Sequence, residues 1–497
     1  MGDVIIAKGG GTSAATGLGF TRMAYQLRKY DLSRIAAFVV SGPGAYTDKN
    51  DPERRLARDM QKGTDVLLDA VREFRSGRRV GTHIADIAQR FDRIEQNTGI
   101  VGDRRASTQV EAAVTNALAN QRWDEVAAIG ELLNAPLFAA FLNEAGIPAA
   151  YVHPKDLGMR VIWNAAGKRW VVDREAYEDI NRRIMELRAA GRLVITAGFC
   201  GVDSEGNIRV FERGGSDYTQ AELARAVRAT LALNMTDVAN VCAAEPSMVA
   251  KPAPNQVMTL DEISELTLGR KFGVLQEDAV IALADAGIPI KVIDTFNDTE
   301  GTYIGIERRI DPDRPIVGVA ARGDFLLIKV RRPGMGDEVG IYDRISRIFA
   351  DQGISLEDFP AARHRLGILV DAKSVNGSLE AIVRRIEVAV ESKKIEVVRD
   401  ITIVNVVGEG IDKMVGVGER IFRALRGANA ASVATRSFDL ACTLAIQTAG
   451  EGNGTGISDT VRRVVSGIHR EFFEERHEWG LTPAAAEERA RANLLRV

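Results

Sequence analysis

The sequence is poor in cysteine and histidine, the residues that most often build disulfides and metal sites. Its 497 residues include three cysteines, at positions 200, 242 and 442, and five histidines that never fall at metal-ligand spacing. An odd cysteine count without a CxxC pair argues against a disulfide framework and a structural zinc cluster. We therefore expect buried, reduced cysteines and no tightly bound metal or organic cofactor.

The sequence also lacks a large net charge and long apolar runs. The 65 basic and 68 acidic side chains leave a formal charge of -3, and no block of like charge marks a nucleic-acid arm or a membrane patch. No run of about 18 apolar residues is available to cross a bilayer. The first residues, MGDVIIAKGGG, lack the basic flank and long apolar run of a signal peptide. These absences predict a cytoplasmic protein without nucleic-acid or membrane partners.

What the chain does have is the length and pattern of a multidomain α/β protein. A length of 497 residues exceeds the usual size of one hydrophobic core. Short β-branched runs at 35–41, 192–198 and 288–294 alternate with helical patterns, which predicts a mostly parallel sheet. Interleaved acidic and basic residues between about 50 and 125 predict helices packed on one side of that sheet.

The C-terminal part contains a repeat. Two prolines and three charges in Asp311–Pro315 have the composition of a domain boundary. Beyond them, the segments that start at Phe325 and Ile401 align with a constant offset of about 76 residues. Each copy is predicted as a strand, a glycine-containing loop, an amphipathic helix and further strands. The predicted organisation is a catalytic domain (1–311), two small modules (316–396 and 397–470) and a helical C-terminal tail (471–497).

Two glycine-rich turns near the start could carry chemistry. The first runs from Lys8 to Ser13 and follows a predicted strand. Its glycines let backbone amides approach phosphate oxygens, and its lysine can neutralise their charge. The second runs from Ser41 to Gly44, ends the next strand and is followed by Thr47. Ligands bind at such strand ends of parallel sheets, although each turn alone is also compatible with an ordinary structural loop.

A third turn, Arg213–Thr219 (RGGSDYT), is the most informative. It stands just before the helical pattern TQAELARAV, and a glycine-containing helix start offers free amides to an anion. Arg213 can hold a carboxylate through two hydrogen bonds, and Asp217 can orient a lysine or hold a metal-bound phosphate. A helix cap without a ligand is the alternative interpretation.

Taken together, the three turns resemble those of the aspartokinases of the amino-acid kinase superfamily, whose pattern reads K-F-G-G-T-S near the start and G-R-G-G-S-D-Y-T later. The order and spacing match, and the resemblance continues at Gly130–Glu131, Val194–Phe199, Thr236–Val238 and Asn297–Thr302. The repeated modules resemble the paired ACT domains of the same family. The resemblance implies a three-layer αβα catalytic domain with a mostly parallel sheet, followed by two ferredoxin-like α+β modules.

The resemblance also implies an activity and residue roles. ATP with Mg²⁺ would phosphorylate the side-chain carboxylate of L-aspartate. Lys8 would stabilise charge on the transferring phosphoryl group, and Asp217 would hold Lys8 in place. Glu131 would bind the substrate ammonium group and Arg213 its α-carboxylate. Further substrate contacts would come from Ser41, Thr47 and Ser216, and nucleotide contacts from Gly10, Gly11, Thr12, Ser13, Thr236, Asp237 and Glu245.

The departures from the family pattern lie mostly on the nucleotide side. The family's tyrosine, aspartate and arginine positions in T-D-V-D-G-x-Y-x-x-D-P-R are occupied by Cys242, Glu245 and Ser247, and its usual lysine in G-A-K-V-L-H-P by Gly273. Two cations near a triphosphate are therefore missing, each worth roughly a few kcal/mol in a desolvated site. Glu212 also replaces a glycine beside the predicted anion site, which hints at a changed substrate preference.

Three functions remain open from the sequence. The first is an aspartate kinase, the second a kinase of another or modified acidic amino acid, and the third a catalytically silent protein that senses amino acids. Retention of Lys8, Glu131, Arg213 and Asp217 favours an enzyme.

The repeat adds a regulatory hypothesis. An effector amino acid would bind at the helix starts around Val339–Gly340 and Val415–Gly416, where free amides suit a carboxylate. A dimerisation module without a ligand is the alternative. Paired ACT modules in the resembled family assemble between chains, which implies a homodimer or a higher homo-oligomer.

Overall fold

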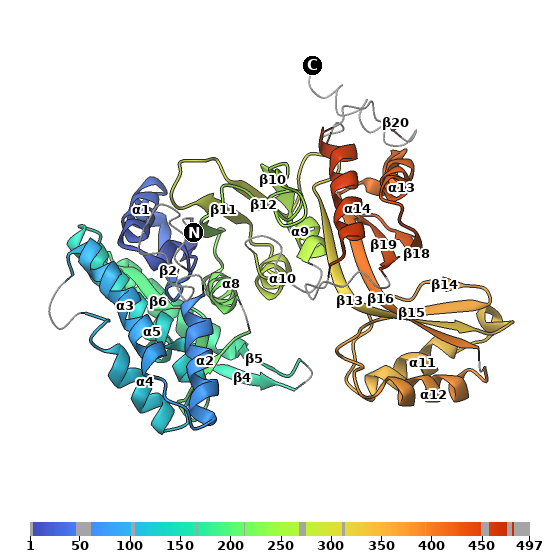
Figure 1. Cartoon of the computed structure of the whole chain (residues 1–497). Helices are drawn as coiled ribbons and strands as arrows, with labels where there is room; N and C mark the ends of the chain where they lie inside the picture. Colours follow the sequence, from blue (N-terminus) through green and yellow to red (C-terminus); the bar gives the residue numbers. More distant parts are fainter. Residues whose placement is uncertain are drawn as a thin grey trace, which may run out of the picture. The chain divides into compact units, whose positions relative to one another are not determined.

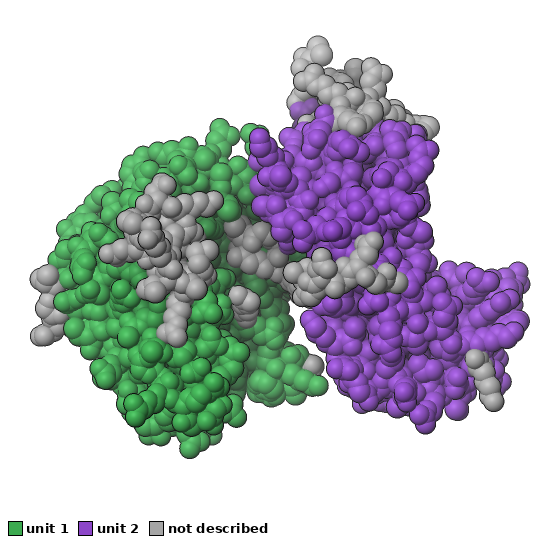
Figure 2. All heavy atoms as spheres, in the orientation of Figure 1, with its two compact units in different colours: residues 1–241, 255–308 green, residues 242–254, 309–497 purple. Residues whose placement is uncertain are grey.

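The computed structural model describes residues 3–45, 61–100, 105–165, 167–212, 214–267, 275–310, 314–392, 394–448, 457–474 and 480–481. The chain divides into two compact units, coloured separately in Figure 2. Unit 1 comprises residues 1–241 and 255–308, and unit 2 comprises residues 242–254 and 309–497. The short segment 242–254 groups with unit 2, although the sequence on both sides of it belongs to unit 1.

Unit 1 is built on an eight-stranded sheet with the strand order β10-β12-β11-β9-β1-β2-β6-β3 (Figure 1). Its strands are β1 (Ile5–Gly9), β2 (Ile35–Val40), β3 (Ala149–Tyr151), β6 (Leu193–Ala197), β9 (Leu231–Thr236), β10 (Val257–Thr259), β11 (Ile290–Asp294) and β12 (Thr302–Gly305). Neighbouring strands pair in parallel, except that β11 and β12 are antiparallel. The predicted mostly parallel sheet is confirmed.

Ten helices and two small hairpins accompany this sheet in the described part of unit 1. The helices are α1 (Gly17–Lys29), α2 (Gly63–Arg75), α3 (Gly81–Thr98), α4 (Val110–Ala119), α5 (Trp123–Glu144), α6 (Pro154–Leu157), α7 (Tyr177–Ala189), α8 (Gly215–Val227), α9 (Leu260–Thr267) and α10 (Glu277–Asp285). The hairpins are β4 (Val161–Asn164) with β5 (Arg169–Val172), and β7 (Cys200–Val202) with β8 (Ile208–Val210).

The side chains of strand β1 alternate between the two faces of the sheet. Ile5 and Ala7 belong to a core cluster with Phe20 of α1 and Phe138 of α5. Because successive side chains of a strand point to opposite faces, Lys8 leaves this apolar layer and points toward the face on which α8 lies. The alternation of one strand thus places a lysine at the start of a helix instead of in the core.

Helix α5 is a core helix that carries polar residues inward. By length and composition it is the one described helix that matches a membrane span, and 67% of its 18-residue window is buried inside the protein. Two of its buried residues, Glu131 and Asn134, are polar. They lie where the helix passes the ends of the central strands, so α5 contributes to the site as well as to the core.

Unit 2 contains a six-stranded antiparallel sheet with the order β14-β15-β13-β16-β19-β18 (Figure 1). The strands are β13 (Gly318–Arg331), β14 (Ala361–Ala362), β15 (Arg365–Asp371), β16 (Ile395–Val407), β18 (Ser432–Ser437) and β19 (Ala441–Gln447), and the helices are α11 (Ile341–Ala350), α12 (Leu379–Ala389), α13 (Val417–Gly427) and α14 (Asp459–His469). The predicted repeat is visible as two successions of strand, loop, helix, strands and helix.

The two copies share their longest strands. Phe325 of β13 pairs directly with Ile401 of β16, so the residues that begin the two aligned segments are also partners across the sheet. The first half of β13 contributes Val319 to the core cluster around α13 and α14, and its second half contributes Ile328 to the cluster around α11 and α12. One strand therefore serves both modules, and the predicted limits of 316–396 and 397–470 stay predictions.

The end of the chain departs in part from the expected helical tail. Arg470–Glu474 form a π-helical turn, and Gly480–Leu481 form a strand, β20, that pairs with β17 (Met414–Val415). A helix was wrong for these two residues, because glycine is a poor helix former and a Thr-Pro pair follows. Residues 475–479 and 482–497 of the predicted tail lie outside the described residues.

The three cysteines are free thiols. Cys200 and Cys442 are buried, as predicted, whereas Cys242 is half-buried. Within the residues that the structure describes, no three His, Cys, Asp or Glu side chains gather as a possible metal site.

Candidate active site

A cavity of about 490 Å³ lies in unit 1 where the glycine turns after β1 and β2 meet the start of α8. The sequence-predicted residues that line it are Lys8, Gly10, Gly11, Thr12, Ser13, Ser41, Glu131, Ser216, Asp217, Thr236 and Asp237. Thr47 and Arg213 lie outside the described residues. Glu245 belongs to the segment grouped with unit 2, so its predicted nucleotide contact stays a prediction.

A buried ion pair occupies one wall of this cavity. Lys8 Nζ lies 2.6 Å from Asp217 Oδ1, and the two side chains are 8% and 5% exposed. Asn234 Nδ2 donates a hydrogen bond to the same carboxylate oxygen at 3.1 Å, and Asn234 is the residue next to Lys8 across the β1–β9 pairing. Three side chains therefore fix one another, and the lysine ammonium is held at the cavity wall.

The role of Asn234 is not evident in the sequence motifs. It stands two residues before Thr236, so alternation along β9 places both side chains on the same face of the sheet as Lys8. That periodicity was the signal that could have identified it.

Among the described residues, no cation pairs with the buried carboxylate of Glu131. Its side chain is 4% exposed, and its Oε2 atom has no hydrogen-bond partner. Burial raises the pKa of Glu131 to about 7, although a backbone hydrogen bond from Gly42 opposes the shift. A buried acceptor that is left unsatisfied costs free energy. An ammonium group entering the cavity would supply the missing partner.

The first two glycine turns interlock. Gly44 N donates to the carbonyl oxygen of Gly11 at 2.8 Å, and a Cβ on Gly44 would lie 2.5 Å from the Gly11 carbonyl carbon. Behind them, Asn134 Nδ2 donates to the carbonyl oxygens of Ala14 at 3.1 Å and of Ser41 at 2.8 Å. Only glycine permits this approach, and the result is a continuous wall of backbone groups.

The predicted nucleotide-binding residues use their polar groups in different ways. Ser13 is fully buried, and its hydroxyl is 2.6 Å from that of Thr295, so this hydroxyl is engaged within the protein. Gly10 N donates to the carbonyl oxygen of Met235 at 2.9 Å. Thr236 Oγ1 donates to the neighbouring Asp237 carboxylate at 3.2 Å. These contacts fix the backbone around the cavity.

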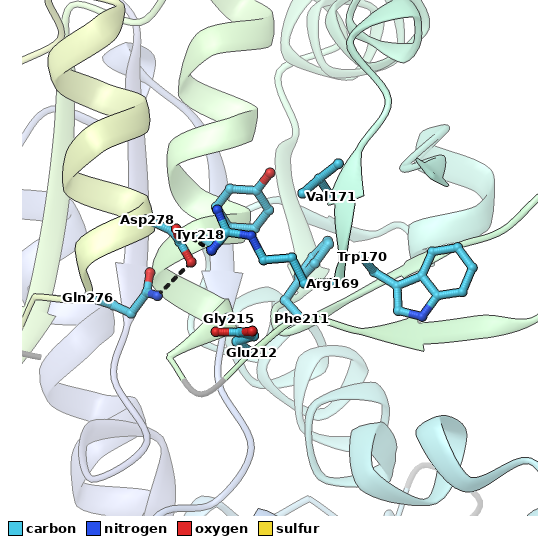
Figure 3. A pocket seen from close by; sticks show the side chains of 9 residues that line it. All are labelled: Arg169, Trp170, Val171, Phe211, Glu212, Gly215, Tyr218, Gln276 and Asp278. Carbon is cyan, nitrogen blue, oxygen red and sulfur yellow. Dashed lines mark hydrogen bonds and ion pairs between the residues drawn. The ribbon is translucent and has the colours of Figure 1, made fainter. Parts of the chain in front are cut away.

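A second, smaller pocket lies beside the third turn (Figure 3). It is lined by Arg169, Trp170, Val171, Phe211, Glu212, Gly215, Tyr218, Gln276 and Asp278. In Figure 3, Arg169 and Gln276 both reach Asp278, at 2.6 and 3.0 Å. Gln276 also packs so closely on the turn that a Cβ on Gly214 would lie 2.6 Å from its Cγ. The pocket links β5, α8 and α10 behind the turn.

This second pocket accounts for the unusual Glu212. Its carboxylate lines the second pocket and is not among the residues that line the larger cavity. Burial lowers the pKa of Arg169, but the hydrogen bond to Asp278 and the charges of Asp278 and Glu212 raise it above its ordinary value overall. A positive Arg169 therefore faces the added carboxylate, which weakens the hint of changed substrate preference drawn from Glu212.

Sequence reasoning missed a third wall of the cavity. The residues at the start of α2 that line it are Lys62, Thr64, Asp65 and Leu68. The sequence pointed to Thr47 because it follows the second turn closely, whereas the structure places Thr64, at the start of α2, in the cavity. The Gly-Thr-Asp run before an apolar helical pattern signals a helix start, but its return to the cavity is a tertiary property.

Comparisons with known proteins cover nearly the whole chain. The model of the amino acid kinase family matches residues 3–294. Aspartokinase 3 of Bacillus subtilis is 28% identical over 478 residues, which are 94% of this chain and 98% of that protein. An aspartate kinase of Stutzerimonas stutzeri, Ask_LysC, is 29% identical over 322 residues, or 62% of this chain and 73% of that protein.

Solved structures share the fold over a similar length. Aspartokinase III of E. coli in complex with aspartate and ADP (R-state) superposes with a TM-score of 0.74 at 20% identity, covering 95% of this chain and 100% of that one. The same enzyme in complex with lysine and aspartate (T-state) gives a TM-score of 0.63 at 21% identity. Aspartate kinase of Clostridium acetobutylicum gives 0.72 at 24% identity, covering 94% and 100%.

Proposed function

This chain belongs to the amino acid kinase family, and we propose that it transfers the γ-phosphate of ATP to the side-chain carboxylate of L-aspartate, giving 4-phospho-L-aspartate. The observation that carries the proposal is that, among the described residues, one cavity presents both a cation and an unpaired carboxylate. Lys8, a cation held in place, lies at one wall. Glu131, a buried carboxylate whose Oε2 atom has no hydrogen-bond partner in the described part of the chain, lies at another. An amino acid and a nucleotide supply the complementary charges.

The reaction brings two anions together. A carboxylate oxygen forms a bond to the γ-phosphorus while the bond from that phosphorus to the β–γ bridging oxygen breaks, and ADP leaves with the electron pair. Positioning and charge neutralisation supply most of the rate in such transfers. Lys8 neutralises the phosphoryl group, Asp217 and Asn234 hold Lys8, and Mg²⁺ arrives with the nucleotide.

The amino acid and the nucleotide occupy different ends of the cavity. Glu131 takes the substrate ammonium group, and Ser41 and Ser216 line the cavity near it. Thr236 and Asp237 line the nucleotide end. Among the residues outside the description, Arg213 remains our proposed ligand for the α-carboxylate.

Hydroxylamine trapping tests this proposal, because an acyl phosphate reacts with hydroxylamine to give a coloured hydroxamate with iron. With ATP and Mg²⁺, we expect hydroxamate from L-aspartate, and none when the nucleotide is omitted. Hydroxamate only from another acidic amino acid would replace aspartate as the substrate. No product from aspartate, glutamate or substituted acidic amino acids would favour the silent amino-acid sensor.

We also propose that unit 2 binds an amino-acid effector. Val339 is 95% exposed, and the glycines that cap α11 and α13, Gly340 and Gly416, have left-handed φ angles of 81° and 90°. Val415 flanks the second cap and is also exposed. These open helix starts suit a carboxylate. A cytoplasmic homodimer or higher homo-oligomer completes the proposal.

Effector control predicts inhibition in the hydroxamate assay. Adding lysine, threonine or methionine, singly or in pairs, is expected to lower the rate at aspartate concentrations near KM. The same additions to a Gly340→Val variant, which blocks one left-handed cap, should inhibit less. Full activity of the unmodified protein in every combination would contradict control by these amino acids.

A further inference from the structure

Lys62 stands at a position that local helix chemistry does not favour. It is the N-cap residue of α2 and makes no capping hydrogen bond there. N-caps are normally Ser, Thr, Asp or Asn, and a cation at a helix N-terminus opposes the helix dipole. Such local conflicts are typical of functional positions.

The backbone on both sides of Lys62 is nevertheless held in place. The preceding residue, Gln61, accepts a hydrogen bond through its carbonyl oxygen from Arg90 Nη1 at 2.8 Å. The following residue, Gly63, donates from its N–H to the carbonyl oxygen of Pro43 at 3.0 Å. Lys62 therefore has an exposed side chain on an anchored backbone, at the edge of the second glycine turn.

Arg90 ties this anchor to the cavity wall. Its side chain is buried, with 5% of it exposed, and it pairs with Asp86 at 3.0 Å. The same Nη1 atom that contacts Gln61 also donates to the carbonyl oxygen of Gly44 at 3.0 Å. Because Gly44 packs on the first glycine turn, one buried guanidinium fixes the position of the Lys62 backbone relative to both turns.

Lys62 lies on the amino-acid side of the cavity. Helix α2 packs on α5: a Cβ on Gly130 would lie 3.9 Å from Leu67 Cδ1. Between the two helices, a Cβ on Gly42 would lie 3.0 Å from the Glu131 carboxyl carbon. The wall that Lys62 shares with Thr64 is thus next to Glu131, whereas the nucleotide end is lined by residues of the β9 end.

The charges that line the cavity indicate what Lys62 can bind. Among the described residues that line the cavity, the basic side chains are Lys8 and Lys62. Lys8 is paired with Asp217, whereas the Lys62 side chain makes no hydrogen bond or ion pair with any residue that the structure describes. An acidic amino acid brings a second carboxylate, which the ammonium site at Glu131 repels.

We propose that Lys62 binds the side-chain carboxylate of the acidic amino-acid substrate and selects for it, and that Arg90 acts as a positioning residue for Lys62. This inference rests on the proposed function and deepens it. Thr64, whose hydroxyl lies on the same wall, would be the neutral hydrogen-bond partner of that carboxylate. No motif recognised in the sequence includes Lys62, so the sequence alone did not indicate this role.

The test compares Lys62→Met and Lys62→Arg with a control, Lys155→Met, which removes an exposed lysine from helix α6. Loss of one charged hydrogen bond is expected to raise KM for aspartate by roughly tenfold or more. The Lys62→Arg and Lys155→Met variants should stay near the unmodified protein, and KM for ATP should not change. An unchanged KM for aspartate in Lys62→Met, or a rise in KM for ATP instead, would overturn the proposal.

Arg90→Met tests the positioning role. The control is Arg105→Met, which removes an ion pair to Glu95 of the same helix, α3. Arg90→Met is expected to raise KM for aspartate and to add little in combination with Lys62→Met, since both remove one interaction. Arg105→Met should leave KM unchanged. Additive effects of Arg90→Met and Lys62→Met on KM would contradict the positioning of Lys62 by Arg90. The melting temperature of each variant shows whether a rise in KM comes from unfolding instead.

A binding measurement keeps this inference distinct from the proposed function. Aspartate should raise the melting temperature of the unmodified protein, and should do so less for Lys62→Met at the same concentration. This difference needs no turnover. A protein that binds aspartate through Lys62 but forms no hydroxamate would retain the present inference and lose the proposed activity. Equal stabilisation of both proteins would overturn the inference alone.

Discussion

Replacing Lys8 with methionine is expected to lower kcat for hydroxamate formation by at least roughly a thousandfold. The ammonium of Lys8 is 2.6 Å from Asp217 in a nearly dry wall of the cavity, where a cation stabilises developing phosphoryl charge far more than in water. Methionine preserves the volume and removes the charge. Steady-state rates at saturating ATP and aspartate measure the loss directly.

The same substitution has a second consequence that must be separated from catalysis. It leaves the Asp217 carboxylate buried without its cation, and breaking a buried pair in this way typically costs about 3–5 kcal/mol of stability. The double variant Lys8→Met/Asp217→Asn should recover much of the melting temperature but none of the activity. Recovery of turnover in the double variant would contradict the catalytic role of Lys8.

A buried ion pair elsewhere in unit 1 provides the control. Arg308 and Glu262 are 5% and 0% exposed and lie 2.6 Å apart, and neither lines the cavity. Arg308→Met should therefore lower stability to a similar degree while kcat at a permissive temperature stays near that of the unmodified protein. The contrast distinguishes a chemical requirement for Lys8 from a general requirement for buried pairs.

Local patterns in the sequence were sufficient to predict the architecture. The β-branched runs predicted at 35–41, 192–198 and 288–294 form β2, β6 and β11, because buried parallel strands need apolar residues on both faces. The first two glycine turns converge because the carboxyl ends of the parallel strands β1 and β2 share one edge of the sheet. The third turn joins them at the start of α8. Lys8 and Asp217, distant in sequence, are brought together by that topology.

Residues that act through tertiary contacts were not predictable in the same way. Asn134 and Asn234 contact the turns from a helix and a strand, at positions that belong to none of the recognised motifs. Thr64 and Lys62 stand at the start of a helix that returns to the cavity after an intervening segment. The sequence therefore favoured Thr47, which is closer along the chain. Distance along the chain does not predict which threonine reaches the cavity, because the buried Arg90 holds the start of α2 against the second glycine turn.

The repeat illustrates the same limit in unit 2. Alignment of the two copies identified two modules correctly, since each has the same order of strands and helices. It did not indicate that β13 and β16 pair along their whole length, with Phe325 opposite Ile401. Strand pairing depends on which edges meet in space, and an internal repeat leaves that choice open.

Glu131→Gln is expected to raise KM for aspartate by roughly a hundredfold, with little change in KM for ATP. The carboxylate of Glu131 is buried, and its Oε2 atom has no hydrogen-bond partner among the residues that the structure describes, so its charge is available to the substrate ammonium group. Glutamine removes that charge while keeping the shape. Glu222→Gln is the matched control, because Glu222 is also buried with a raised pKa but lies outside the cavity. An unchanged KM in Glu131→Gln would contradict the ammonium site.

The pKa of Glu131 makes this prediction sharper, because affinity and stability should respond to pH in opposite directions. Its folded-state value of about 7 lies above the ordinary 4.5, so the free folded protein holds this proton more tightly than the unfolded chain. Stability then falls as pH rises from about 4.5 to about 7, at a cost of about 3 kcal/mol. Above pH 7, Glu131→Gln should therefore melt at a higher temperature than the unmodified protein, and near pH 4.5 the two should agree.

Binding of aspartate needs the ionised carboxylate of Glu131, so kcat/KM for aspartate should rise with pH through about 7 in the unmodified protein. The Glu131→Gln variant should not show that rise. The ionised Glu131 carboxylate destabilises the empty site, and a bound ammonium group removes that cost, which is why the site has affinity for a cation.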